Sequence, residues 1–287
     1  MNIKTRLPIL FIAPTLVLLA TLALIPLVYA IIIAFQNQTL MKPDSSFVGL
    51  ENFFNLFSDR RFINSLKISF IWELVTVSFT MILAIFLGIL IHEKSSPVMK
   101  KFLTLLLLIP VLLPRVAAAF VWKFALHPIF GLFTYPYKLI TSQSLELLSN
   151  PSTALYTVAM VDVWQWGLFF AIIILKLLET LPREPFDAAR LDNAKTWEIH
   201  FYISLPMLKA PLVVLMFVKM IESLRSFDLI YVITRGGPGI TTETLDMYAF
   251  SLAFIENGRV SYASSMAILM MILTAIIFTV IWKRASK

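Results

Sequence analysis

Six long apolar segments constrain the fold of this chain more than any other feature of its sequence. A helix needs about 20 mostly apolar residues to cross the hydrocarbon core of a bilayer. Because a lipid-exposed backbone must pair its own polar groups, such segments form helices. The segments cover roughly residues 8–35, 67–91, 102–126, 153–178, 207–234 and 262–282. The sequence therefore predicts an all-α, polytopic membrane protein with six transmembrane helices.

The composition agrees with this fold class. Hydrophobic residues make up 59% of the chain and charged residues only 14%, which is far more apolar than a soluble domain requires. The net charge of +7 arises from basic residues in short loops beside the apolar spans, a pattern typical of membrane orientation rather than of nucleic-acid binding. The chain has no cysteine, which excludes disulfides and thiolate chemistry. Without an internal repeat or a linker, we expect one domain over residues 1–287.

Lysine and arginine residues predict the orientation of the spans. They are more numerous, and lie in shorter loops, on the side that holds both chain ends and the polar loop at about 183–206. Such loops are retained in the cytoplasm. We therefore expect both termini and this loop to be cytoplasmic. The first apolar run is too long for the core of a signal peptide, so we interpret it as a membrane helix.

The 183–206 loop predicts two short helices with a turn between them. Pro185 suits a first helical turn, and Asp187 suits the positive end of the helix dipole. Asn193 tolerates a left-handed backbone and can therefore close this first helix. A second helix is expected over about 196–203, with Pro206 ending it.

The spacing of residues in this loop resembles a known motif. Asp187-Ala188-Ala189-x-x-Asp192-Asn193-Ala194, followed after eight residues by Ile203-x-Leu205-Pro206, is similar to the EAA loop of ATP-binding-cassette importer permeases. Two positions depart from the family, which usually has Glu in place of Asp187 and Gly in place of Asn193. Both departures keep the relevant property, a carboxylate and a tolerance of positive φ. The resemblance implies a coupling helix that docks into an ATPase through Asp187, Ala188, Ala189, Asp192, Asn193 and Ala194.

Other segments extend the resemblance over nearly the whole chain. They are Ala13-Pro14, Pro26-Leu-Val-Tyr, Gly49-Leu-Glu-Asn-Phe, Asp162-Val-Trp-Gln-Trp and the run from Phe227 to Gly239. Together they are similar to the carbohydrate-uptake, maltose-type branch of these permeases. The resemblance implies a non-catalytic subunit in the bacterial cytoplasmic membrane that imports a sugar or sugar-like solute. It also implies a second permease chain, two ATPase subunits that bind ATP and Mg, an extracytoplasmic solute-binding protein and contact with membrane lipids.

The sequence lacks the motifs of several catalytic and metal sites. No Gly-x4-Gly-Lys-Ser/Thr phosphate loop occurs, so we do not expect this chain to hydrolyse ATP. His92, His127 and His200 are scattered without a metal-binding spacing, and we interpret them as interfacial or loop residues. No Gly-x-Ser-x-Gly nucleophile motif is present either. We expect no cofactor, no metal and no nucleic-acid partner.

Polar side chains inside the fourth and fifth spans form the candidate solute site. An ionisable group at membrane depth is costly and marks a functional position by default. At about 1.5 Å per residue, Asp162 and Trp166 lie about 12–20 Å from the outer end of the fourth span. By the same rise, Lys219, Glu222 and Ser223 lie about 18–24 Å from the inner end of the fifth span. The resemblance implies that these two helices line the sugar cavity. The candidate substrate-binding residues are Asp162, Trp166, Phe169, Lys219, Glu222, Ser223 and Ser226.

Some alternatives stay open at this point. Lys219 and Arg225 could neutralise Glu222 and pack against the second permease chain instead of binding solute, and Trp164 is expected to pack on the opposite helix face. The imported solute could be glycerol phosphate or another non-sugar compound. A stand-alone secondary transporter is a further alternative, although such proteins often show inverted repeats and paired broken helices. Only the third span is predicted to be broken, at Pro110 and Pro114.

Overall fold

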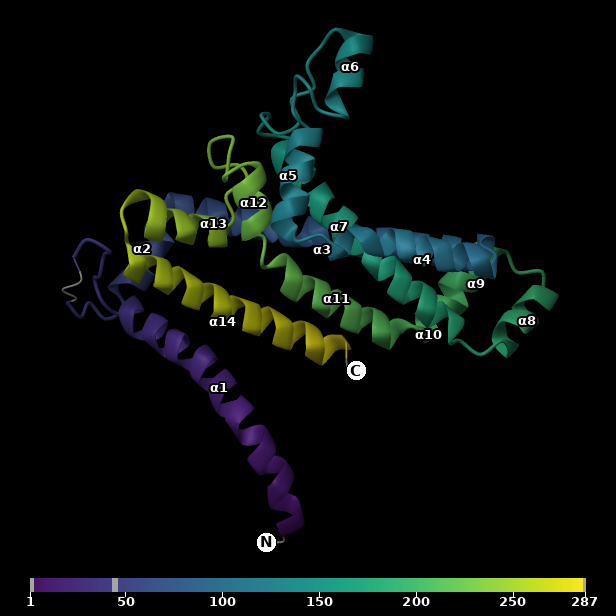
Figure 1. Cartoon of the computed structure of the whole chain (residues 1–287), viewed down its shortest axis with the longest axis horizontal. Coiled ribbons are helices and arrows are strands. Elements are labelled where there is room, and N and C mark those ends of the chain that lie inside the picture. Colours follow the sequence, from purple (N-terminus) through teal and green to yellow (C-terminus); the bar gives the residue numbers. More distant parts are fainter. Residues whose placement is uncertain (1–2, 43–45, 286–287) are drawn as a thin grey trace. The chain divides into compact units, whose positions relative to one another are not determined.

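The computed structural model describes residues 3–42 and 46–285 as helices joined by turns (Figure 1). These residues contain no β-strand beyond an isolated bridge between Gln36 and Phe47. Contacts divide the chain into two compact units, one of Met1–Ile63 with Tyr248–Ile277 and one of Asn64–Met247 with Phe278–Lys287. The expectation of one domain over residues 1–287 stays a prediction.

The first unit contains two long apolar helices and one short amphipathic helix. These are α1 (Ile3–Ala34), most of α14 (Val260–Ala285), and α2 (Glu51–Ser58). Helix α2 buries Asn52 and Leu56. The Asn52 amide donates to the backbone oxygens of Ala34 at 2.9 Å and Gln36 at 2.8 Å. Because the last carbonyls of a helix lack intrahelical donors, this side chain fixes how the chain leaves α1.

Asp59 then connects α2 to the following helix. Its carboxylate accepts hydrogen bonds from the Tyr248 hydroxyl at 2.6 Å and the Tyr262 hydroxyl at 3.1 Å. The backbone N–H groups of Arg61 and Phe62 donate to the same side chain. Burial acts to raise the pKa of Asp59, but these hydrogen bonds outweigh it and hold the pKa below its usual value. Asp59 therefore joins the start of a long helix to the C-terminal part of the unit.

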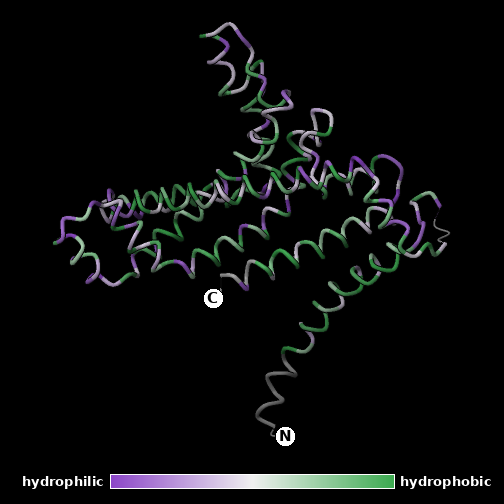
Figure 2. The backbone as a smooth tube through the Cα atoms, turned by 180° about the vertical axis from the view of Figure 1, so that it is seen from behind, coloured by the Kyte–Doolittle hydropathy of each residue, from purple (hydrophilic) through white to green (hydrophobic). Residues whose placement is uncertain are grey.

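The second unit contains most of the remaining helices and all of the candidate site residues. Its helices are most of α3 (Arg60–Lys94), all of α4 (Pro97–Leu112), α5 (Arg115–Ala125), α6 (Thr134–Thr141), α7 (Ala154–Glu179), α8 (Glu184–Leu191), α9 (Thr196–Ile199), α10 (Leu205–Met207), α11 (Lys209–Ser223) and α12 (Phe227–Ile233), and the first half of α13 (Leu245–Phe250). Helix α4 packs along α7, and α5 packs against α12. The hydrophobic residues are spread along the long helices, while hydrophilic residues gather in the connection around α8 (Figure 2).

Small residues allow α3 and α7 to approach closely. A Cβ atom built on Gly88 of α3 would lie 2.8 Å from Ile174 Cγ2, and one built on Gly167 of α7 would lie 2.8 Å from Leu83 Cδ2. Packing through small residues is typical of helices in membranes, where van der Waals contact stabilises association. The two glycines therefore set the spacing of the pair of helices on which the site is built.

Six candidate spans occur among the described residues when bent helices are counted as pairs. Four helices, α1, α3, α7 and α14, are each long and apolar enough to cross a membrane. Helices α4 and α5 form a further pair bent by 95°, and Thr196–Met207 forms another with α11, bent by 76°. This arrangement confirms the predicted all-α, polytopic fold.

The break in the third span lies where the prolines predict it. Pro114 has no N–H to donate to the carbonyl of Pro110, so the helical hydrogen bonding is interrupted. The Gln165 amide of α7 donates to the Pro110 oxygen at 3.0 Å and to the Leu113 oxygen at 2.8 Å. Irregular backbone at membrane depth is stable only where protein or a water-filled cavity covers it, and Gln165 supplies part of that cover.

The expectation of one continuous helix over 207–234 is wrong. Helix α11 ends at Ser223 and α12 begins at Phe227. Asp246, which is distant in sequence, accepts hydrogen bonds from the Ser226 hydroxyl at 3.0 Å and from the backbone N–H of Phe227. A carboxylate that takes a first-turn N–H acts as a helix cap. A tertiary contact therefore begins a new helix inside an apolar run.

Candidate functional site

The loop between α7 and α11 forms the first candidate site, and its first half has the predicted structure. Pro185 lies in the first turn of α8, and Asn193 has a φ of +58°. The N–H of Ala194 donates to the Ala189 oxygen at 3.0 Å, and that of Asn193 donates to the Arg190 oxygen at 3.1 Å. A bond from an N–H to the carbonyl five residues earlier is the Schellman closure, which requires a left-handed residue. The predicted role of Asn193 in ending the helix is confirmed.

Helix α8 buries none of its residues against this chain. Among the predicted coupling residues, Ala189 and Ala194 are half-buried, and the rest are exposed: Asp187, Ala188, Asp192 and Asn193. A helix of eight residues is too short to be stable in water by itself. Without a buried face of its own, α8 is suited to pack against a partner.

The second half of the loop differs from the prediction. The expected end of this helix at about residue 203 is wrong, because a π-helical turn, His200–Ser204, continues from α9 into α10. Pro206 lies in the first turn of α10, and the helical segment ends one residue later, at Met207. The N–H of Leu205 donates to the His200 oxygen. This bond spans five residues instead of four, and the shifted register accommodates the proline ring that a regular α-helix would exclude.

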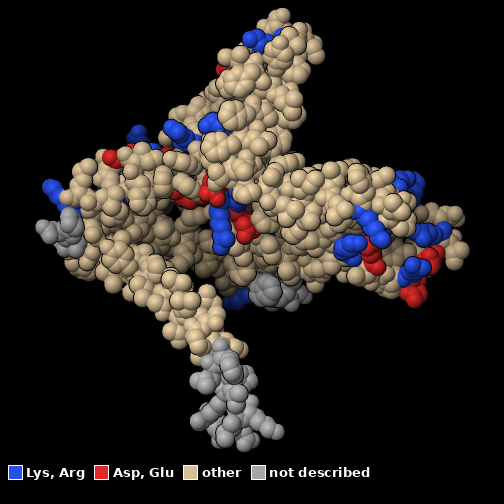
Figure 3. Space-filling model, viewed as in Figure 1, with Lys and Arg blue, Asp and Glu red and all other residues tan. Residues whose placement is uncertain are grey.

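A polar cavity of about 530 Å³ lies between α8 and the ends of α3, α4 and α7. Glu179 lies 2.9 Å from Lys176 and 3.8 Å from Lys100, and Asp187 lies 3.6 Å from Arg190. Basic and acidic side chains gather over this end of the unit, whereas the surface over α4 carries almost no charge (Figure 3). The charges are those of a surface that meets water, not lipid.

The second candidate site is a charge cluster inside the apolar region. Asp162 of α7 binds two cations, Arg115 of α5 through Nη2 to Oδ1 at 2.7 Å, and Lys219 of α11 through Nζ to Oδ2. The side chains of Asp162 and Lys219 are 0% exposed, so water does not compensate their charges. Because a buried charge is stable only when paired, the cluster joins three helices. The structure thus brings together two of the predicted residues from separate spans.

Glu73 of α3 supplies a second carboxylate to this cluster. The Ser223 hydroxyl donates to Glu73 Oε2, and the Trp72 indole donates to the backbone oxygen of Ser223 at 2.9 Å. Arg115 also donates to the backbone oxygen of Glu222 at 3.3 Å. Neither Glu73 nor Arg115 is among the site residues predicted from the sequence. The signal for Glu73 was available, since it is an ionisable residue within an apolar span.

Aromatic side chains border the cluster. The Trp166 ring centroid lies 6.1 Å from that of Phe169 and 5.8 Å from Lys219 Nζ. Both aromatic residues are partly exposed. Trp164 packs against Trp122 with ring centroids 5.4 Å apart, as expected of a packing residue. Tryptophan beside a charged group at this depth can stack on an apolar surface while the polar groups orient a ligand.

Two predicted solute-binding residues lie apart from the Asp162 ion pairs. Ser226 donates to Asp246 in the separate contact that begins α12. Glu222 is 26% exposed at its side chain and lies 3.8 Å from Arg225, while Lys219 pairs with Asp162. The alternative in which Arg225 neutralises Glu222 therefore has a geometric basis, whereas Lys219 has another partner.

These elements define a multi-pass helical membrane protein with broken spans and an exposed polar helical loop. The chain belongs to the family of binding-protein-dependent transport system inner membrane components, because the model of that family matches residues 80–286. Members of this family are transport subunits, not enzymes.

Curated relatives cover most of the chain. The trehalose/maltose transport system permease protein MalF of Thermococcus litoralis is 28% identical over 99% of this chain and 95% of its own length. The sulfoquinovosyl glycerol transport system permease protein SmoG of Agrobacterium fabrum is 29% identical over 93% of this chain and 86% of its own length.

A solved structure has the same fold. A chain of a bacterial importer of the acidic polysaccharide alginate superposes with a TM-score of 0.87 at 18% identity, over 99% of this chain and 96% of that one. A second structure, of the alginate transporter in complex with a periplasmic protein that holds an alginate pentasaccharide, gives a TM-score of 0.85 at 18% identity, over 97% and 93% of the two chains.

Proposed function

We propose that this chain is the permease subunit of an ATP-binding-cassette importer and forms half of the translocation pathway for a sugar or sugar-like solute. The exposed α8, closed by the left-handed Asn193, carries the proposal, because it is a preformed helix with no buried face in this chain. A cleft in a partner would supply the missing contacts. The proposed partner is a cytoplasmic ATPase, which binds ATP and Mg, while this chain provides the coupling surface.

The remaining partners and the orientation follow from the same proposal. A second permease chain completes the pathway, two ATPase subunits bind the two coupling loops, and an extracytoplasmic binding protein delivers the solute. Both termini and the 183–206 loop lie in the cytoplasm, which the positions of the Lys and Arg residues support. The family description and the binding protein in the neighbouring importer structure support this assembly.

A neutral, hydroxyl-bearing solute fits the charge cluster best. Arg115 and Lys219 both pair with Asp162, so neither cation of the cluster is free to pair with an anionic solute. An importer of glycerol phosphate or another anion would instead need an uncompensated cation facing the solute. The named solutes of MalF, trehalose and maltose, are neutral sugars and support this choice, whereas the sulfoquinovosyl glycerol of SmoG is a sugar that carries a sulfonate.

Among the predicted solute-binding residues, we assign direct contact to the partly exposed Trp166, Phe169 and Glu222. Asp162, Lys219 and Ser223 are buried behind them and hold the helices together. Trp166→Ala and Glu222→Gln should therefore change the selectivity of uptake among sugars without reducing the amount of assembled complex. Loss of one hydrogen bond to a charged group corresponds to about tenfold or more in affinity. Unaltered selectivity in both variants would remove these residues from the site.

The experiment for the function as a whole is uptake by the purified complex. The tagged chain is isolated with its partners, reconstituted in liposomes, and supplied with the binding protein and labelled maltose or trehalose. We expect uptake that depends on both ATP and the binding protein. Uptake driven by an ion gradient in the absence of ATPase subunits would instead establish a secondary transporter.

A further inference from the structure

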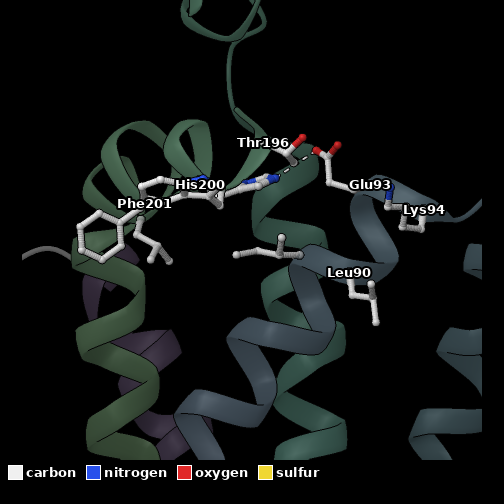
Figure 4. A pocket seen from close by; sticks show the side chains of 9 residues that line it. Leu90, Glu93, Lys94, Thr196, His200 and Phe201 are labelled. Carbon is white, nitrogen blue, oxygen red and sulfur yellow. Dashed lines mark hydrogen bonds and ion pairs between the residues drawn. The ribbon is translucent and has the colours of Figure 1, made fainter. Parts of the chain in front are cut away.

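One buried imidazole joins the coupling loop to the end of α3. His200, in the π-helical turn after α9, is 4% exposed. Its Nε2 lies 3.0 Å from Glu93 Oε1, and its Nδ1 lies 2.9 Å from Ser204 Oγ. With Nε2 donating to the carboxylate, Nδ1 accepts from the serine hydroxyl, so both ring nitrogens are engaged and the ring has a fixed orientation. Figure 4 shows His200 extending toward Glu93 while Phe201 points away from it.

The large aromatic side chains of this helical segment do not anchor it, whereas Ile199 and Ser204 are buried. Trp197, Phe201 and Tyr202 are between 59% and 67% exposed. A cavity of about 600 Å³ separates part of the segment from α3, with Ile89 and Leu90 in its lining. Beside this cavity, the contact between His200 and Glu93 is a direct side-chain link between the segment and α3.

Helix α3 also reaches the intramembrane cluster. Glu73 and Glu93 lie on the same continuous helix, and their separation of 20 residues corresponds to about 30 Å along its axis. Glu73, near the middle of α3, accepts from Ser223 of α11, and Glu93, at the C-terminal end of α3, binds His200. The rigid helical stretch between these two contacts can convey a displacement of the loop to the region of the solute site.

We propose that His200 and Glu93 form a positioning pair that couples movement of the 183–206 loop to α3, and through α3 to the charge cluster. The pair does not touch ATP or solute. This inference rests on the proposed importer function, since it concerns how ATP hydrolysis in a partner is linked to transport. The π-helical turn supports it, because such turns occur frequently at functional positions in helices.

The experiment measures how many solute molecules the reconstituted complex imports per ATP hydrolysed. His200→Ala and Glu93→Ala should each lower this ratio severalfold while ATP hydrolysis continues. Because the two side chains act together, the double variant should be no worse than the single ones. His200→Gln keeps a donor toward Glu93 and should restore a large part of the ratio. Lys94→Ala, at a residue that lines the same cavity beside Glu93, is the matched control and should match the wild type.

The outcomes separate this inference from the proposed function. Suppose that the wild-type complex shows ATP-driven uptake and that both alanine variants keep its ratio of solute imported to ATP hydrolysed. The positioning pair would then be overturned and the importer function would stand, even if less of the variant complexes were recovered. Multiplicative losses in the double variant would also overturn it, because the residues would then act independently. A wild-type complex that fails to couple ATP hydrolysis to uptake would overturn the importer function itself.

Discussion

At the scale of single residues, Asn193 illustrates how local chemistry can be read from sequence. Its short polar side chain tolerates the left-handed region. Its φ of +58° is a conformation that glycine, the usual residue of the family at this position, adopts freely. The charge cluster could be predicted only in part. Asp162 and Lys219 were found from their depth, but their pairing with each other and with Arg115 depends on how three helices pack. No spacing within one helix reveals that arrangement.

Substitutions at Asn193 test the importance of the turn. Asn193→Val should impair solute-stimulated ATP hydrolysis, because a left-handed backbone costs an L-residue about 1–2 kcal/mol and a β-branched side chain fits it poorly. Asn193→Gly should retain stimulation, since glycine adopts positive φ freely. Stimulated hydrolysis is measured on the assembled complex. Equal activity in the two variants would show that the conformation of this turn is not required.

At the scale of elements, the helices that depend on apolar runs and on proline were predictable. The break at Pro110 and Pro114 follows from fixed proline geometry, and so does the start of α8, whose first turn holds Pro185. The break before α12 was not predictable, because Asp246 begins the new helix from a distant segment. The continuation of the helix through Pro206 was missed for a different reason, since a π-helical turn changes the hydrogen-bond register ahead of the proline.

The contact between α3 and α7 gives a prediction at the same scale. Gly88→Ala places a Cβ against the branched Cβ of Ile174 at 3.1 Å and its Cγ2 at 2.8 Å, whereas Gly167→Ala meets the flexible tip of Leu83. Gly88→Ala should therefore destabilise the unit by about 1–3 kcal/mol, and Gly167→Ala should cost less. Thermal unfolding of the detergent-solubilised complex measures both. A larger loss for Gly167→Ala would contradict this description of the interface.

At the scale of the whole molecule, the orientation in the membrane can be tested by labelling. The chain has no cysteine of its own, so single cysteines can be introduced at Ile240 and Lys195, both of which are exposed. In intact cells, an impermeant thiol reagent should label Ile240→Cys and spare Lys195→Cys, because the coupling loop is proposed to be cytoplasmic. Labelling of both positions after permeabilisation controls for reactivity. Labelling of Lys195→Cys from outside would reverse the proposed topology.

The central claim is that α8 couples this permease to an ATPase, and stimulation of ATP hydrolysis by the solute-loaded binding protein tests it most directly. Ala189→Glu adds bulk and charge to a half-buried position of the proposed docking surface. Met99→Glu adds the same carboxylate to an exposed first turn of α4, where the helix dipole tolerates it. With both variants inserted in the membrane at wild-type levels, Ala189→Glu should lose stimulation or release the ATPase, and Met99→Glu should retain it. Full stimulation in Ala189→Glu would contradict the claim.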